Sequence, residues 1–142
     1  MLKQFLFVAL LLTTSHTLSN TIFIGDSIAH GYKIYNKGTG TTKIGANPKK
    51  VLSFIHLANY SNVDKVILSS GISNQCNDIS TVKKQLSYLN FKNVKVTMLS
   101  NNNCYGATSN LKAICVKYSN CKFEYIPNGK DGVHPNQYNK KF

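Results

Sequence analysis

Strand-like and helix-like segments alternate along this chain of 142 residues, and this alternation restricts the fold more than any other feature. Strands are predicted where short apolar runs end in turn residues, at 21–25, 41–44, 65–69, 94–99 and 123–126. Helices are predicted at 48–58, 79–89 and 109–118, with short helical pieces near 28–35 and after Pro135. Alternating units of this kind indicate an α/β fold whose parallel sheet has helices on both faces.

Residues suited to nucleophilic catalysis lie near the two ends of the chain. Ser27, in the run Gly-Asp-Ser-Ile, directly follows the first predicted strand, where its side chain would point over the edge of the sheet. Asp131 and His134 are three residues apart on a loop bounded by Gly and Pro. A serine hydroxyl needs a base to remove its proton, and that base needs a third group to fix its tautomer. The sequence therefore supplies a nucleophile, a base and an orienting acid.

The Gly-Asp-Ser and Asp-x-x-His blocks together resemble the SGNH (GDSL-type) hydrolase family, over roughly residues 20–142. The resemblance implies that Ser27 is the nucleophile, His134 the base and Asp131 the orienting acid. It implies an α/β fold of the flavodoxin-like type, a three-layer α/β/α sandwich with a central parallel sheet of about five strands. It also implies ester hydrolysis by acyl transfer, a reaction that needs no metal or organic cofactor.

In that family a glycine and an asparagine complete the oxyanion hole, together with the backbone N–H of the serine. The resemblance implies that here they are Gly45, after the second predicted strand, and Asn74, after the third. Gly38 and Gly40 are nearby alternatives to Gly45. Ligands of parallel sheets bind beyond the carboxyl ends of the strands, so Ser27, Gly45 and Asn74 are expected to converge there.

The asparagine block departs from the family pattern. The common form, Gly-x-Asn-Asp, would place asparagine at position 73, where this chain has Ser73. Asn74 is displaced by one residue, and Asn77, followed by an aspartate, offers a second candidate. The choice between Asn74 and Asn77 stays open at this point.

Each of these residues also has a structural interpretation. Ser27 could cap a helix, the Asp-Gly pair at position 131 is common in turns, and His134 could be an ordinary loop residue. Asp26 is expected to be structural, bonding to backbone or hydroxyl groups around its turn. The remaining histidines are weaker candidates for the base; they are His16, His30 and His56. The order of the blocks, each after a predicted strand, favours catalysis.

The first nineteen residues have the layout of a secretory signal peptide. Lys3 gives a positive start, residues 5–12 are apolar, and residues 15–19 are mostly small and polar. The apolar run is too short to span a bilayer as a helix. We expect cleavage near Asn20, with an uncleaved N-terminal anchor as the alternative. Either outcome places a single domain, residues 20–142, outside the cytoplasm, secreted or periplasmic.

The four cysteines agree with export. None has C-x-x-C spacing and the histidines are scattered, which disfavours a zinc site. Four cysteines allow three pairings. Cys76 and Cys104 each follow a predicted strand on the same edge, and Cys115 and Cys121 flank one short stretch. We therefore expect the pairs Cys76–Cys104 and Cys115–Cys121, with four reduced thiols as the alternative.

All 17 basic residues are lysines, against five acids, for a formal net charge of +12. Such a charge attracts anionic polymers and membrane surfaces. The absence of arginine and of any recognisable motif disfavours specific nucleic-acid binding. An A/T-rich genome, which favours Lys, Asn and Ile codons, would produce the same bias without selection for charge.

These observations together predict a secreted, monomeric serine esterase. The small domain predicts an open cleft, which favours short acyl groups such as an O-acetyl on a glycan or a related small ester. A lysophospholipase or thioesterase is the second choice among enzymes. The alternative from another class is an inactive module with the same fold that binds anionic glycan or membrane surfaces.

Overall fold

The computed structural model describes residues 20–70, 78–100 and 107–142. Its centre is a four-stranded, all-parallel sheet in the order β1-β2-β3-β4. The strands are β1 (Thr21–Gly25), β2 (Lys65–Ser69), β3 (Lys95–Ser100) and β4 (Cys121–Tyr125). The helices are α1 (Ser27–Tyr35), α2 (Pro48–Leu57), α3 (Ile79–Phe91) and α4 (Ala107–Cys115). The predicted α/β fold with a parallel sheet flanked by helices is confirmed.

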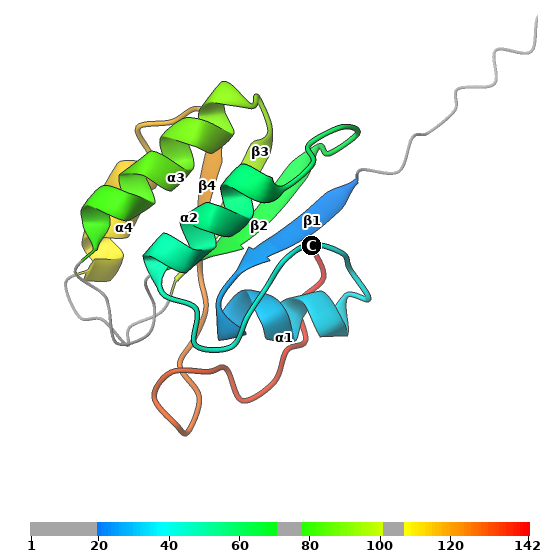
Figure 1. The fold of residues 1–142 in the computed structure, drawn as a ribbon. Coiled ribbons are helices and arrows are strands. Elements are labelled where there is room, and N and C mark those ends of the chain that lie inside the picture. The colour runs from blue at the N-terminus through cyan, green and yellow to red at the C-terminus, as the bar shows by residue number, and fades with distance from the viewer. Residues whose placement is uncertain (1–19, 71–77, 101–106) are drawn as a thin grey trace, which may run out of the picture.

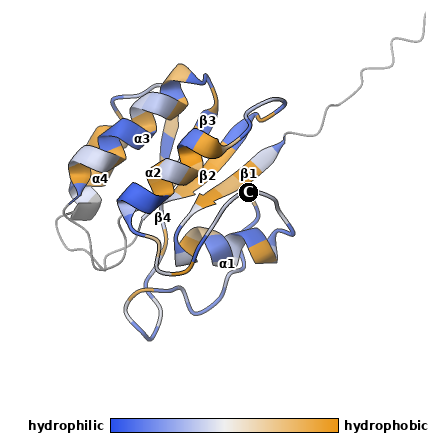
Figure 2. Cartoon of the chain, in the orientation of Figure 1, coloured by the Kyte–Doolittle hydropathy of each residue, from blue (hydrophilic) through white to orange (hydrophobic). Residues whose placement is uncertain are grey.

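Alternate residues of the strands pack on opposite faces of the sheet. In β2, Val66 and Leu68 belong to the core cluster that includes residues of α2, α3 and α4, whereas Ile67 belongs to the cluster around α1. Figure 1 shows α2, α3 and α4 on one side of the strands and α1 on the other. Burial on both faces explains why β2 is a continuous apolar run, coloured orange in Figure 2.

The parallel connections give the sheet two distinct edges. At the carboxyl edge the strands end and α1, α2 and α3 begin; at the amino edge the strands begin and α2, α3 and α4 end (Figure 1). The loop 58–64 therefore lies at the amino edge, and Asp26, between β1 and α1, lies at the carboxyl edge. In the described part of the chain, no helix combines the length and apolar character needed to cross a membrane.

The strand predicted at 41–44 is replaced by two isolated parallel bridges to β1, Ile22 with Thr39 and Gly25 with Thr42. Gly40 interrupts the ladder between them, with φ at +119°. Its backbone passes so close to β1 that a Cβ there would lie 2.0 Å from the carbonyl oxygen of Phe23. A glycine kink of this kind breaks regular pairing.

The helical piece predicted after Pro135 is also wrong, because residues 136–142 contain no helix. They run over α1, held by aromatic side chains. Tyr138 and Phe142 pack edge-on against Tyr32 of α1, with ring centroids 4.9 and 5.2 Å away. Tertiary packing has overridden local helical preference in this segment.

A disulfide joins Cys115, the last residue of α4, to Cys121, the first residue of β4. It closes the turn at the amino edge, and α4 ends at Cys115, before residue 118, the predicted end. The expected partners Cys76 and Cys104 lie outside the described residues.

Candidate active site

The backbone at the end of β1 directs Ser27 out of the sheet. Gly25 has φ at +149°, and a Cβ there would lie 2.2 Å from the carbonyl oxygen of Ser69 on β2, so only glycine fits. Asp26 then caps α1, its Oδ1 accepting the Ile28 N–H at 3.0 Å. Ser27 is therefore the first residue of α1, and it is half-buried at the carboxyl edge.

The structure brings Ser27, His134 and Asp131 together in one hydrogen-bonded chain. Ser27 Oγ lies 2.8 Å from His134 Nε2, although the two residues are 107 positions apart. His134 Nδ1 lies 2.7 Å from Asp131 Oδ2. A proton on Nδ1, donated to the carboxylate, leaves Nε2 free to accept the serine proton. This arrangement can activate a serine for attack on a carbonyl carbon.

The loop that carries Asp131 and His134 is tied together by its own backbone. Asp131 Oδ1 accepts the N–H groups of Val133 and His134, at 2.8 and 2.7 Å. The Gly129 N–H donates to the His134 carbonyl at 2.6 Å, where a Cβ on Gly129 would clash. One carboxylate oxygen thus holds the loop and the other holds the imidazole, so Asp131 sets the direction in which His134 points.

The same contacts keep Asp131 ionised. Its hydrogen bond with His134, then those from the backbone N–H groups of Val133 and His134, lower its pKa from the ordinary value to about 2. The site is open to solvent, because the side chains of His134 and Asp131 are 40% and 55% exposed. A carboxylate faces the imidazole throughout the neutral range, and a bulky substrate can reach it.

The C-terminal segment fastens this loop to α1, a feature that the sequence reasoning missed. The Tyr138 hydroxyl donates to the Ser27 carbonyl at 3.5 Å. Its ring lies so close to Gly31 that a Cβ there would be 2.2 Å from it. Asn36, at the end of α1, accepts the Phe142 N–H and donates to the Lys140 carbonyl. Gly31, a glycine inside a predicted helical stretch, was the sequence signal that could have indicated this close packing.

Asp26 is the other acidic group at the site, and it is buried. Its Oδ1 accepts the Ser69 hydroxyl at 2.6 Å, and its Oδ2 has no hydrogen-bond partner among the described residues. Burial raises its pKa above the ordinary value, although the hydrogen bond from Ser69 opposes the shift. Bonds to a hydroxyl and to a backbone N–H agree with the structural role expected for it.

This burial predicts a pH effect on stability. The folded protein holds the Asp26 proton at pH values where the unfolded chain has lost it, so the free energy of unfolding should fall as pH rises through the folded pKa. Asp26→Asn removes the ionisable group and with it this pH dependence of the free energy of unfolding. We therefore expect the variant to gain stability relative to the parent as pH rises from the acidic into the neutral range, measured by urea denaturation. Asp131 does not interfere, because its contribution is lost only as pH falls towards 2. The prediction would be contradicted if the free energies of unfolding of the parent and the variant changed with pH in parallel.

The remaining predicted residues are placed as follows. Gly45 lies in an exposed turn with φ at +75°, just after a segment tied to β1 by the Lys43 N–H to Gly25 carbonyl bond. It is thus near the carboxyl edge. Asn74 and the alternative Asn77 lie outside the described residues, and so does His16.

The other two histidines are not part of the hydrogen-bonded chain. His30 lies 3.0 Å from the Thr42 hydroxyl, and His56 stacks edge-on against Tyr88 on the outer face of α2 and α3. Among the described residues, no group of three or more His, Cys, Asp or Glu side chains is placed to hold a metal ion. No family model, curated protein or solved structure matches this chain.

Proposed function

We propose that this protein is an exported serine esterase of the SGNH (GDSL-type) hydrolase family. The observation that carries the proposal is the continuous chain of hydrogen bonds from Ser27 through His134 to Asp131. Two further features support it: Ser27 lies at the carboxyl edge of a parallel sheet, where such folds bind ligands, and hydrogen bonds hold the pKa of Asp131 below its ordinary value.

In the proposed reaction, His134 Nε2 removes the Ser27 proton as Oγ attacks an ester carbonyl carbon. Asp131 stabilises the imidazolium that forms. The tetrahedral intermediate collapses and expels the alcohol, which takes the proton from His134. Water, activated by the same imidazole, then releases the acid and restores Ser27. A water-exposed site favours this second step.

The substrate we propose is a short acyl ester on a large acceptor, such as an O-acetyl group on a glycan. The exposure of His134 and Asp131 supports this choice, because the site gives little enclosure for a long acyl chain. The expected result is that the purified protein hydrolyses p-nitrophenyl acetate with a higher kcat/KM than p-nitrophenyl octanoate. The opposite order would favour a lysophospholipase or thioesterase.

The oxyanion hole in this proposal consists of the backbone N–H groups of Ser27 and Gly45 and the side chain of Asn74. A preorganised donor of this kind contributes on the order of 3 kcal/mol to transition-state stabilisation. Asn74→Ala should therefore lower kcat by about 10²–10³-fold with little change in KM, whereas Asn77→Ala should be much milder. Steady-state kinetics of the two variants tests this, and the reverse ranking would identify Asn77 as the donor.

The finer fold we propose is the flavodoxin-like three-layer sandwich. The bridges from Thr39 and Thr42 to β1 support it, because they add a fifth, incomplete strand on the far side of β1 from β2. For export, the disulfide Cys115–Cys121 supports an oxidising compartment. An inactive binding module is excluded if ester hydrolysis is observed and is lost with Ser27.

A further inference from the structure

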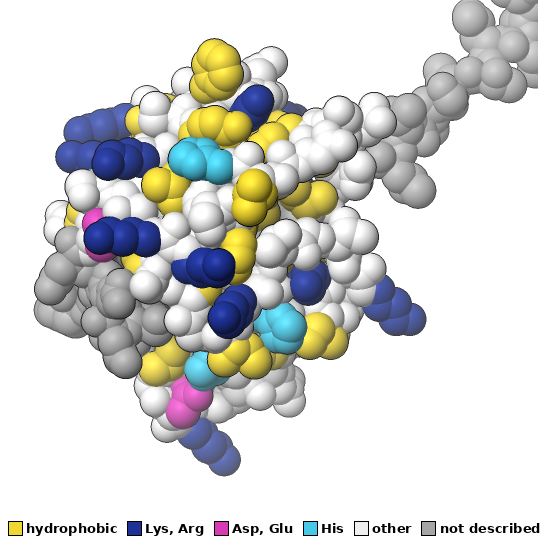
Figure 3. Space-filling model, viewed as in Figure 1, with side chains coloured by type: hydrophobic (Ala, Val, Ile, Leu, Met, Phe, Trp, Pro, Cys, Tyr) yellow, Lys and Arg dark blue, Asp and Glu magenta, His cyan; other side chains and the backbone are white. Residues whose placement is uncertain are grey.

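Large apolar side chains are exposed at the ends of three consecutive helices. Leu57 ends α2, Phe91 ends α3, and Val116 directly follows α4; they are 85%, 80% and 65% exposed. All three helices end at the amino edge of the sheet. Figure 3 shows hydrophobic side chains and lysines interspersed at the upper end of the molecule, where α3 ends in Figure 1. Because these three side chains are largely exposed, burial in the described part of the domain does not account for their apolar character.

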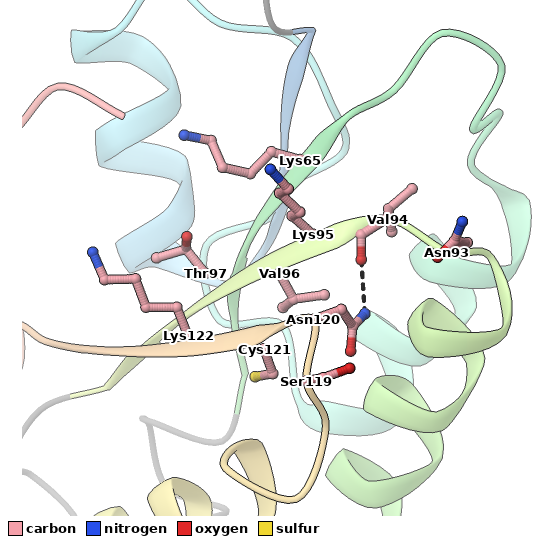
Figure 4. A pocket seen from close by; sticks show the side chains of 10 residues that line it. All are labelled: Lys65, Asn93, Val94, Lys95, Val96, Thr97, Ser119, Asn120, Cys121 and Lys122. Carbon is pink, nitrogen blue, oxygen red and sulfur yellow. Dashed lines mark hydrogen bonds between the residues drawn. The ribbon is translucent and has the colours of Figure 1, made fainter.

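Lysines surround the same edge. Lys65, Lys95 and Lys122, from β2, β3 and β4, project from one side of the sheet beside an open hollow of about 670 Å³ (Figure 4). Lys65 and Lys95 are directly paired in the sheet register. Like charges at paired positions repel each other, and an anion bound beside them would relieve this repulsion. Lys92 and Lys117 add charge beside Phe91 and Val116.

Few acids balance these lysines. Asp64, which accepts the Asn20 N–H, is the one acidic residue in the turns of this edge. Of the other acids, Asp26, Asp78 and Asp131 lie at the carboxyl edge or at a helix start. Glu124 forms ion pairs with both Lys140 and Lys122, the latter at 3.5 Å, so its single charge is shared between two lysines. The amino edge is therefore strongly positive.

We propose that the amino edge binds the surface of a bilayer that contains anionic phospholipids. Lysines alone would suit any polyanion, but exposed Leu57 and Phe91 can also leave water by inserting among lipid chains, which adds a hydrophobic contribution to binding. Lysines near an anionic leaflet add electrostatic attraction to that insertion. Asn20 precedes β1 at this edge, so residues 1–19 are joined to the chain on the same side.

Binding through the amino edge determines where the catalytic residues lie relative to the bilayer. The five residues of β1 span roughly 16 Å, and Ser27 lies beyond their far end. A domain bound through its amino edge therefore presents Ser27 and His134 away from the bilayer. The acyl group would come from a molecule outside the membrane, such as a glycan, and not from lipid in the same leaflet. This last step depends on the proposed esterase function; the binding itself does not.

The test is co-sedimentation of the purified full chain with vesicles of phosphatidylcholine, with or without phosphatidylglycerol. We expect binding only when phosphatidylglycerol is present, and a steep loss of binding as salt rises above physiological strength. Replacing Lys65, Lys95 and Lys122 together with Gln should lower the partition coefficient about 100-fold, at about fivefold per lysine. Leu57→Ser combined with Phe91→Ser should lower it about tenfold at low salt.

Matched controls come from the carboxyl edge. Replacing Lys43, Lys49 and Lys50 together with Gln removes as much charge as the triple lysine variant of the amino edge. Ile44→Ser removes an apolar side chain that is 69% exposed. Both controls should bind vesicles nearly as well as the parent. Parent, variants and controls share the same N-terminus, so any binding through residues before Asn20 would be common to all of them.

The proposal would be overturned if the amino-edge variants and their controls lost vesicle binding equally. Binding to pure phosphatidylcholine that no variant alters would also overturn it. Binding to soluble polygalacturonate or DNA without binding to vesicles would also overturn it, and would make the lysines a polyanion site instead. Hydrolysis of soluble p-nitrophenyl acetate by the edge variants should match the parent. A failed esterase assay with normal vesicle binding would reject the proposed function alone.

Discussion

Ser27→Ala is expected to abolish ester hydrolysis, lowering kcat by about 10⁴-fold or more. The change removes the only atom that can attack the carbonyl in the proposed mechanism, Ser27 Oγ, which lies 2.8 Å from the base. Little packing is lost, because Ser27 is half-buried and its backbone starts α1 without help from the side chain. The free energy of unfolding should therefore change by no more than about 1 kcal/mol.

Hydrolysis of p-nitrophenyl acetate and thermal unfolding of both proteins measure these effects. Ser61→Ala, in an exposed turn, is the matched control and should keep parental kcat. A fluorophosphonate should label the parent at Ser27 and leave the Ala variant unlabelled, as read by peptide mass spectrometry. Normal turnover by Ser27→Ala would end the serine-esterase proposal.

The strands that the sequence predicts well are those that are buried on both faces. The apolar run before Ser27 and the one at 65–69 have the predicted bounds, because continuous burial requires continuous apolar side chains. The segment 41–44 has a similar local pattern, but Gly40 passes too close to Phe23 for a regular ladder. That contact joins residues 17 positions apart, so no local pattern could reveal it.

In the candidate site, too, local features could be predicted from the sequence, whereas long-range contacts could not. Asp131 and His134 are close in sequence, and their side chains meet through one short loop, so their spacing was informative. The contact of His134 with Ser27 depends on how the C-terminal segment packs on α1. Tyr138 and Ser69 support the site through long-range contacts, and neither carries a sequence signal that sets it apart from a surface tyrosine or a strand serine.

Asp131→Asn is expected to lower kcat by about 10⁴-fold with little change in KM. An amide can still accept the N–H groups of Val133 and His134 through its oxygen, so the loop should keep its shape. At the other position the amide then presents its NH₂ group to His134 Nδ1, where the parent presents a carboxylate oxygen. The imidazolium that forms during attack then loses its counter-charge, and the wrong tautomer is favoured.

Three measurements separate this effect from a structural one. Thermal unfolding near neutral pH should show a fold as cooperative as the parent's, and fluorophosphonate labelling of Ser27 should slow along with kcat, because both need the activated hydroxyl. Asp64→Asn, which removes an acid at the opposite edge, should leave kcat unchanged. Since the Asp131 carboxylate has a pKa of about 2, its effect on kcat should persist across the neutral range. A loss of less than about tenfold in kcat would show that solvent can replace Asp131, and that His134 is oriented by its loop alone.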